Sequence, residues 1–467
     1  MSEKPCPRKT TGLLITCVAG MVLFAPGLWS CDLWSPREPM YAEIGHGIAA
    51  SGNWLTLRVN GEPYYNKPPV FFWLETLCIK AFGLQTASVR LPSFVLGVGG
   101  LVLCYLIARR LGIDPLMSSL ILATCWRFPR ASQRANLDVP LVFFMLLAFY
   151  LYLVSLEANR GGWAYSLGAA LAACAAMMVK GPVALLLLGC AIFPHLLWHG
   201  RWKEVLHWKW LVAVLIIACA GGAWLLAMTR LEGEEFINTL LGREVASRFS
   251  ADWERPKPIY HYFTAFTRDF IPWIIFFPMA LAHAWKHRNQ KVFQLLLWFA
   301  AVFIILTLIP ARSVRYIIPL YPVAAMFVAA YLSDWKAWSW RTPRFRAIVG
   351  LTAIGLLCCS VAYDPHRNLK KSSMPLVSFL KAEGATQEDV LWYRSYEPGV
   401  AFYAGFPKMR VVQEMDSLDE HPHVLLIAKE DALPEAINGV PPVKRFRIGR
   451  KRYAVFRADQ PGAAKTP

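Results

Sequence analysis

Charged side chains are scarce in this chain. Only 17% of its 467 residues are Asp, Glu, Lys or Arg, whereas 56% are hydrophobic. Soluble globular proteins usually contain about 25% charged and about 45–50% apolar residues, so this composition excludes an ordinary soluble domain. Apolar runs of the length that a bilayer requires, about 20 residues in a helix, recur from residue 13 to residue 362. We therefore expect a polytopic membrane protein.

Motifs for metals and cofactors are also missing. The chain has eleven cysteines, but no CxxC and no Cys/His pair has the spacing of metal ligands. Most of these cysteines fall inside apolar runs, where Cys behaves as a small hydrophobic residue. No glycine-rich phosphate loop follows a strand, and no Asp-x-Asp stands in a loop expected to face outward. We expect neither a metal nor a cofactor.

Acidic residues are outnumbered, with 31 Asp and Glu against 49 Lys and Arg, which gives a formal net charge of +18. In a soluble protein such an excess would suggest nucleic acid as a partner. Here the basic residues cluster in short loops between apolar runs, as the positive-inside rule describes for membrane proteins. We therefore expect contact with membrane lipids and none with nucleic acid.

The apolar runs predict a mainly α-helical bundle of about eleven spans. They lie at about 13–30, 88–107, 116–128, 137–156, 163–178, 181–198, 209–229, 271–286, 292–309, 314–333 and 345–362. The first run resembles a signal peptide, but its length and the lack of a clear cleavage site favour an uncleaved span. With the N-terminus in the cytoplasm, the short inter-span loops on that side are basic. The odd number of spans then places the C-terminus outside.

The sequence changes character after residue 363. We predict an extracytoplasmic α/β domain over 364–458 and a disordered tail over 459–467, with residues 1–363 forming the transmembrane domain. Within the small domain a helix is expected over 372–384, closed by Gly384. Short strands are expected at 390–394, 400–405, 409–415 and 423–428, followed by a hairpin of 443–448 with 452–457.

Two carboxylates are candidates for chemistry on the outer face, which includes the loop 31–87. Glu38 begins a stretch with helical spacing of Tyr41, Ile44 and Ile48, which fits a helix in the membrane interface. Asp138 lies just inside the outer end of an apolar span, where ionisable residues are costly and usually face a cavity or a partner. Either carboxylate has a plainer explanation as a charged helix cap.

Several cations are expected on the same face. Lys180 lies at a tight outer hairpin, although a snorkelling Lys is common there. Lys67 follows Tyr65 and precedes two prolines that fix an extended turn. Other candidates come from the segments 255–263 and 310–322, namely Arg255, His261 and Arg312. Cations stabilise a departing phosphate and a carboxylate takes a proton from an acceptor hydroxyl, so this set suits group transfer from a membrane-anchored phosphate.

An ordered series of motifs resembles one known family. The first outer loop reads "REPMYAEIGHGIAASGNWLTLRVNGEPYYNKPPVFFWL", and "ASVRLPS", "ANLDVPLVFF", "VKGPVALLL" and "RYIIPLYPVAA" follow. This series is similar to the GT-C glycosyltransferases related to protein O-mannosyltransferases and bacterial aminoarabinose transferases. Tyr41, Lys67, Asp138 and Lys180 match that pattern. The chain departs from it at three places, where the family's first acid, an Arg and a second acid are replaced by Arg37, Met40 and Asn66.

The resemblance implies a GT-C enzyme of the bacterial inner membrane, with a cytoplasmic N-terminus and a periplasmic C-terminal domain. It would move a sugar from a polyprenyl-phosphate donor to a lipid, glycan or protein acceptor, by an inverting displacement at the anomeric carbon. Glu38 or Asp138 would be the base, and Lys67, Lys180 and Arg312 would bind the donor phosphate. Side chains expected to bind substrate are Tyr41, Tyr65, Arg255 and His261.

Two other functions fit parts of the sequence. A transporter or flippase for a lipid-linked sugar would carry ionisable groups near the bilayer midplane, often in two matching halves. An inactive scaffold of the same family is the second alternative, because the family's first acid is replaced by Arg37.

Overall fold

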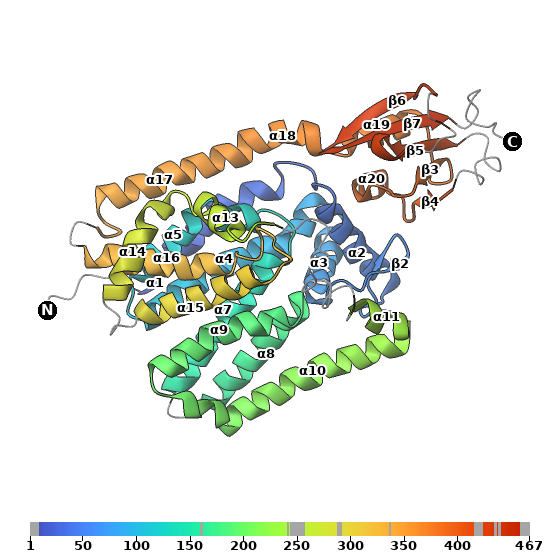
Figure 1. Cartoon of the computed structure of the whole chain (residues 1–467). Helices are drawn as coiled ribbons and strands as arrows, with labels where there is room; N and C mark the ends of the chain where they lie inside the picture. The colour runs from blue at the N-terminus through green and yellow to red at the C-terminus, as the bar shows by residue number, and fades with distance from the viewer. Residues whose placement is uncertain are drawn as a thin grey trace.

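A computed structural model describes residues 9–158, 162–240, 242, 257–286, 292–335, 338–414, 424–433, 437 and 440–457. The predicted tail over 459–467 lies outside these residues. The described part is mainly helical, with a small β-sheet domain near the C-terminus (Figure 1).

The membrane part is built from helices, most of them apolar and some of them short. These are α1 (Lys9–Phe24), α4 (Thr86–Arg110), α5 (Pro115–Thr124), α6 (Arg127–Ser132), α7 (Asp138–Glu157), α8 (Gly162–Lys180), α9 (Val183–Trp198), α10 (Trp208–Glu232), α11 (Glu234–Asn238), α13 (His261–Asp269), α14 (Phe277–Lys286), α15 (Val292–Leu308), α16 (Leu320–Asp334) and α17 (Pro343–Cys358). Short 3₁₀ turns are η1 (Ala25–Leu28), η2 (Trp202–Leu206) and η4 (Trp273–Phe276). Helix α7 packs against α4 and α8, and α5 packs against α4 and α16.

The multi-pass helical architecture is confirmed. Six described helical stretches are long and apolar enough to span a membrane, and the number rises to seven if the bent pair His261–Asp269 with Trp273–Lys286 counts as one span. Four shorter apolar helices, α5, α9, α15 and α16, occupy the other predicted spans. The count of eleven therefore stays a prediction.

The loop after the first span folds into two helices and a short hairpin. They are α2 (Arg37–Ser51), β1 (Arg58–Val59), β2 (Glu62–Pro63) and α3 (Val70–Phe82). Helix α2 ends at Gly52, whose φ of 71° is a left-handed conformation that glycine adopts without steric cost. The helix that the spacing of Tyr41, Ile44 and Ile48 predicted is confirmed; these three side chains are buried and α2 packs on α3, and its place in the membrane interface stays a prediction.

Helix α17 continues into the C-terminal part without an irregular linker. A five-residue π-helical turn, η5 (Cys359–Tyr363), joins it to α18 (Asp364–Lys371), so the helical stretch Pro343–Lys371 is 29 residues long. In Figure 1 this long helix runs beside the bundle and leads directly to the sheet domain.

The C-terminal domain is a mixed sheet covered by short helices. Its elements are α19 (Met374–Ala382), β3 (Val390–Tyr393), α20 (Pro398–Ala404), β4 (Arg410–Val412), β5 (Leu425–Lys429), η7 (Glu430–Ala432), β6 (Lys444–Ile448) and β7 (Lys451–Arg457). The strand order is β4-β3-β5-β7-β6, with β3 parallel to β4 and β5, and β7 antiparallel to β5 and β6. The expected helix before Gly384 and the closing hairpin are both confirmed.

One predicted strand is wrong, because residues 400–405 lie in helix α20 and the turn after it. Pro398 occupies the first turn, where a missing N–H costs nothing, and Gly405 ends the helix with a φ of 75°. Apolar residues of α20 pack against α2 and α19. A six-residue apolar stretch fits either kind of element, and here the flanking Pro and Gly decide for a helix.

The sheet domain is docked on the loop after the first span. Asn60 donates to the carbonyl of Met409 at 2.9 Å, and the Tyr396 hydroxyl donates to Glu43 at 3.1 Å. The backbone N–H of Leu33 donates to the Tyr403 hydroxyl at 2.7 Å. These contacts link residues more than 300 positions apart and hold the sheet domain against the loop after the first span.

Candidate active site

An ion pair between Asp138 and Lys180 stands at one end of the α7–α8 hairpin. The two helices have 20 and 19 residues and pack side by side, with a short connection between them. The last residue of α8 therefore returns to the level of the first residue of α7. The Lys180 ammonium donates to Oδ1 of Asp138, and the side chains are only 9% and 6% exposed. Removal of either partner would leave the other charge buried alone.

The amide side chain of Asn136 fixes the start of α7. Its Oδ1 accepts from the backbone N–H groups of Asp138 at 2.9 Å and Val139 at 3.1 Å. Its Nδ2 donates to the carbonyls of Ala131 and Arg134, each at 2.7 Å. A cap of this kind satisfies helix N–H groups that have no partner within the helix. Because Asn136 is the cap, the Asp138 carboxylate is left to contact Lys180.

Two tyrosines, Tyr316 and Tyr41, lie near this pair. The Lys180 ammonium lies 4.8 Å from the centre of the Tyr316 ring. Burial raises the pKa of the Tyr41 phenol, Tyr64 and then Asp138 raise it further, and Arg37 opposes them. Such electrostatic effects require close neighbours, so Asp138 and Tyr64 each lie near Tyr41. The structure thus brings together three of the residues that the sequence singled out, Tyr41, Asp138 and Lys180.

Glu38 lies in a separate, fully occupied polar network. Its Oε1 accepts from Nε of Arg90 and from the backbone N–H of Ala135, both at 2.9 Å. Its Oε2 accepts from a terminal nitrogen of Arg90 at 2.9 Å and from the backbone N–H of Trp34 at 3.0 Å. Arg134 approaches the same oxygen to 3.7 Å. This carboxylate joins α4, the loop after the first span and the segment that leads into α7.

The charges around Glu38 keep it ionised. Burial alone would raise the pKa of this carboxyl, but Arg90, Arg134 and the hydrogen bonds outweigh burial and hold the pKa below its usual range. A carboxylate stabilised in this way is a weak base. Because its partner Ala135 lies three residues before Asp138, Glu38 is well placed to position that segment.

Two other candidates, Lys67 and Tyr65, make contacts within the loop after the first span and with α10 and α11. Lys67 lies on the turn before α3, where its ammonium donates to the carbonyl of Asn66. The Tyr65 hydroxyl donates to Glu232 at 3.0 Å, and its ring packs on Phe236 of α11. Of two adjacent tyrosines in an extended segment, Tyr64 therefore faces Tyr41 and Tyr65 faces the α10–α11 junction.

Candidates from the later segments are only partly described. Arg312 donates to the carbonyl of Thr307 at 2.8 and 3.1 Å and also to that of Lys257, so its guanidinium braces the loop before α16. His261 begins α13, and the neighbouring Tyr262 hydroxyl accepts from the backbone N–H of Ser313 at 3.2 Å. Arg255 lies outside the described residues. Over the described ranges, no group of His, Cys, Asp and Glu has the arrangement of a metal site.

Several buried charged residues were missed in the sequence, among them Arg90 and Glu75. Arg90 is fully buried and belongs to the "ASVRLPS" motif, which was the signal that could have identified it. Glu75 of α3 is also fully buried, and neither of its oxygens has a hydrogen-bond partner among the residues that the structure describes. Burial raises the pKa of Glu75 well above its ordinary value, and the nearby Glu38 charge raises it further. The pKa of Glu75 is thus shifted upward while that of the nearby Glu38 is shifted downward.

Comparison with known proteins adds independent support. The model of the dolichyl-phosphate-mannose-protein mannosyltransferase family matches residues 66–224, and that of the Alg9-like mannosyltransferase family matches residues 257–396. The chain is 29% identical over 385 residues to the undecaprenyl phosphate-alpha-4-amino-4-deoxy-L-arabinose arabinosyl transferase of Pseudomonas paraeruginosa, which covers 80% of this chain and 69% of the relative. It is also 29% identical over 324 residues to a protein of Aquifex aeolicus, with 69% of this chain and 64% of that relative covered. The chain thus spans about two thirds of the length of these relatives.

A solved structure shows the same fold. The crystal structure of ArnT from Cupriavidus metallidurans bound to undecaprenyl phosphate matches with a TM-score of 0.79 and 19% identity, over 98% of this chain and 100% of that one. The order of the motifs, the two family models and the shared fold all agree. The chain belongs to the family of GT-C membrane glycosyltransferases that includes the protein O-mannosyltransferases and the aminoarabinose transferases.

Proposed function

We propose that this protein transfers a sugar from a polyprenyl-phosphate donor to a cell-envelope acceptor at the outer face of the bacterial inner membrane. The observation that carries the proposal is the buried Asp138–Lys180 ion pair, which lies near Tyr41 and Tyr316 at one end of the bundle. The similarity to aminoarabinose transferases supports undecaprenyl phosphate as the carrier. The acceptor is lipid A or its core, another envelope glycan, or protein.

Lys180 has two successive partners in this mechanism. Before the donor binds, its ammonium neutralises Asp138. When the donor binds, its phosphate attracts the ammonium groups of Lys180 and Lys67. The Asp138 carboxylate then becomes available as a base. Asp138 then takes the proton of an acceptor hydroxyl whose oxygen attacks the anomeric carbon. The bond from that carbon to the phosphate oxygen breaks, and the polyprenyl phosphate leaves with the electron pair, stabilised by both lysines.

Glu38 acts on this reaction through position. Its two oxygens are already engaged by Arg90 and by two backbone N–H groups, one of them in the segment before Asp138. We therefore assign the base to Asp138 and a positioning role to Glu38. This assignment also explains how the chain can work with Arg37 where the family has an acid, since Asp138 and Lys180 are both retained.

A transporter is the rival function. In that case ionisable groups near the middle of the spans would be needed. The buried pair instead lies at helix ends, because Asp138 is the first residue of α7 and Lys180 the last residue of α8. This placement favours group transfer at the membrane surface.

The test uses membrane vesicles and radiolabelled undecaprenyl-phosphate sugars, one carrying 4-amino-4-deoxy-arabinose and one carrying a hexose. Wild-type protein should transfer label to envelope acceptors, and Asp138→Asn should lose transfer while its abundance stays near that of the wild type. Asp114→Asn is the matched control, because Asp114 caps α5 at the opposite ends of the spans. Full transfer by Asp138→Asn would refute the assigned base. Movement of lipid-linked sugar across the bilayer without transfer would favour the transporter.

A further inference from the structure

A cavity of about 290 Å³ lies at the opposite end of the bundle from the Asp138–Lys180 pair. It is lined by residues from the last turns of α4, α7 and α9 and from the loop that follows α9. Helix α7 separates the two sites, because Asp138 is its first residue and Glu157 its last. Twenty residues at 1.5 Å each span about 30 Å, which is the thickness of the hydrocarbon core. The cavity therefore opens at the second membrane surface.

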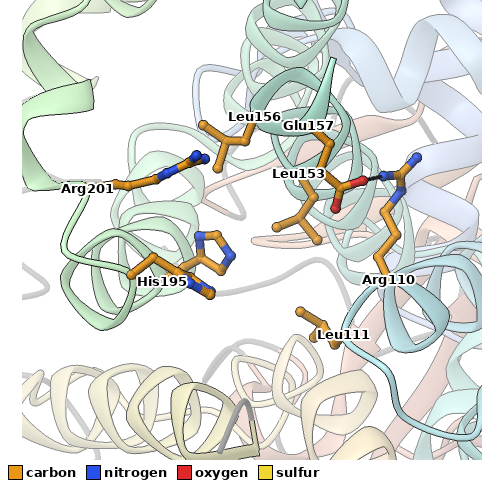
Figure 2. Close-up of a pocket in the computed structure, with 8 residues that line it drawn as sticks. Arg110, Leu111, Leu153, Leu156, Glu157, His195 and Arg201 are labelled. Atoms are coloured by element: carbon orange, nitrogen blue, oxygen red, sulfur yellow. Dashed lines mark hydrogen bonds and ion pairs between the residues drawn. The ribbon is translucent and has the colours of Figure 1, made fainter. Parts of the chain in front are cut away.

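The lining of this cavity has an apolar floor and a cationic rim. Figure 2 shows Leu153 and Leu111 facing the open centre, with Arg110 and Glu157 on one side and His195 and Arg201 on the other. Arg110 is paired with Glu157, so these two charges cancel. Among the described residues no carboxylate forms an ion pair with Arg201. The rim therefore carries an excess positive charge at Arg201, beside the imidazoles of His195 and His199, whose rings lie 4.5 Å apart.

Exposed tryptophans mark the depth of this cavity. Trp202 and Trp208 follow Arg201 in sequence and are 55% and 58% exposed. Tryptophan is enriched where the hydrocarbon core meets the headgroups. On the neighbouring α9, Phe193 and Leu197 are 58% and 52% exposed, as expected of side chains that face acyl chains. The cationic rim thus lies at headgroup level and the leucine floor at the level where acyl chains begin.

We propose that this cavity binds the phosphate headgroup of an anionic phospholipid from the leaflet opposite the active site. Basic pockets between transmembrane helices suit such headgroups. A guanidinium offers paired N–H donors that match phosphate oxygens, and Arg201 has those donors at the rim. The three leucines, Leu111, Leu153 and Leu156, cover the glycerol and the first methylenes of the chains. A bound lipid would join the ends of α4, α7 and α9 that line the cavity. The opposite ends of these helices carry the Asp138–Lys180 pair or lie next to it.

The experiment measures lipid retained by the purified full-length protein. Protein in detergent is mixed with cardiolipin, phosphatidylglycerol or phosphatidylcholine, and the bound lipid is counted by native mass spectrometry. Wild type should retain cardiolipin and phosphatidylglycerol in preference to phosphatidylcholine. Arg201→Ala should weaken that retention about tenfold or more, since a charge-assisted contact to phosphate is lost. Lys203→Ala is the matched control, because it removes the same charge from the same loop but does not line the cavity.

A second variant is expected to change lipid binding in the opposite direction. Glu157→Gln removes the carboxylate that engages Arg110, so anionic lipid should bind more tightly than to wild type. Equal losses from Arg201→Ala and Lys203→Ala would show a diffuse basic surface and overturn the site. If inorganic phosphate displaced the lipid at equal concentration, the ligand would be a soluble phosphate and the lipid assignment would fail.

Discussion

Loss of the Glu38 charge should destabilise the protein through Arg90. An arginine has five N–H donors, and all five of Arg90 are used: two reach Glu38 at 2.9 Å and three reach the carbonyls of Gly27, Cys31 and Asp32 at 2.7–2.9 Å. The Arg90 side chain is completely buried. Glu38→Gln would leave this guanidinium buried without a counterion, and breaking such a pair costs about 3–5 kcal/mol.

The double variant Glu38→Met/Arg90→Met distinguishes a positioning role of Glu38 from a role as the general base. Replacing both charges removes the lone buried charge, so the double variant should be more stable than the sum of the single losses predicts, by about 1.5–3 kcal/mol. Unfolding of the purified proteins in detergent, followed by intrinsic fluorescence against denaturant, gives these free energies. Transfer activity is then measured at a temperature where every variant is folded.

The two roles predict different activities for that double variant. If Glu38 positions the segment before Asp138, part of the activity should return when Arg90 is also replaced, because the stranded charge no longer distorts the loop. If Glu38 is the base, activity stays absent whatever stands at residue 90. A fully stable Glu38→Gln variant would refute the structural reasoning, since the ion pair would then contribute nothing.

Three further predictions concern other parts of the chain. Lys180→Ala and Lys67→Ala should each weaken use of the polyprenyl-phosphate donor about tenfold or more, seen as a raised KM in the transfer assay; unchanged donor use would contradict the phosphate contacts. The pKa of Glu75 is raised in the folded protein, so its contribution to stability is complete below the pKa of the unfolded state, about 4.3, and is lost as pH rises toward the pKa of the folded state. The unfolding temperature should therefore decrease as pH rises in wild type, and decrease less in Glu75→Gln. Equal pH slopes for the two proteins would show that Glu75 does not titrate in the fold. A reporter active only outside the cytoplasm should work when fused after Lys371 and fail after Arg201; the reverse pattern would invert the proposed orientation.

Much of the architecture could be predicted because membrane helices are specified by long apolar runs. The antiparallel pairing of α7 and α8 also follows from sequence, since their connection is short and their lengths match. That geometry is what brings Asp138 to Lys180. The helix α20 could not be predicted in the same way, because seven residues carry too little periodicity to separate a helix from a strand.

The site could be predicted only in part, for a different reason. Whether Tyr64 or Tyr65 faces Tyr41 depends on the local path of an extended segment, in which neighbouring side chains point in opposite directions. The partner of Glu38 is Arg90, 52 residues away on another helix, so no local pattern links the two. Glu75 falls in an apolar helix where its burial, rather than its spacing, makes it unusual.

The unbroken helix from Pro343 to Lys371 sets the height of the sheet domain above the membrane. Its 29 residues extend about 43 Å at 1.5 Å each, whereas the hydrocarbon core is about 30 Å thick. About a dozen Å of helix therefore extends beyond the hydrocarbon core and connects it to the sheet domain. Each residue added to or removed from this helix would turn the domain by about 100° and shift it by about 1.5 Å. Asn60 would then no longer contact Met409, and Glu43 would no longer contact Tyr396. The length of this helix therefore determines how the sheet domain docks on the loop after the first span.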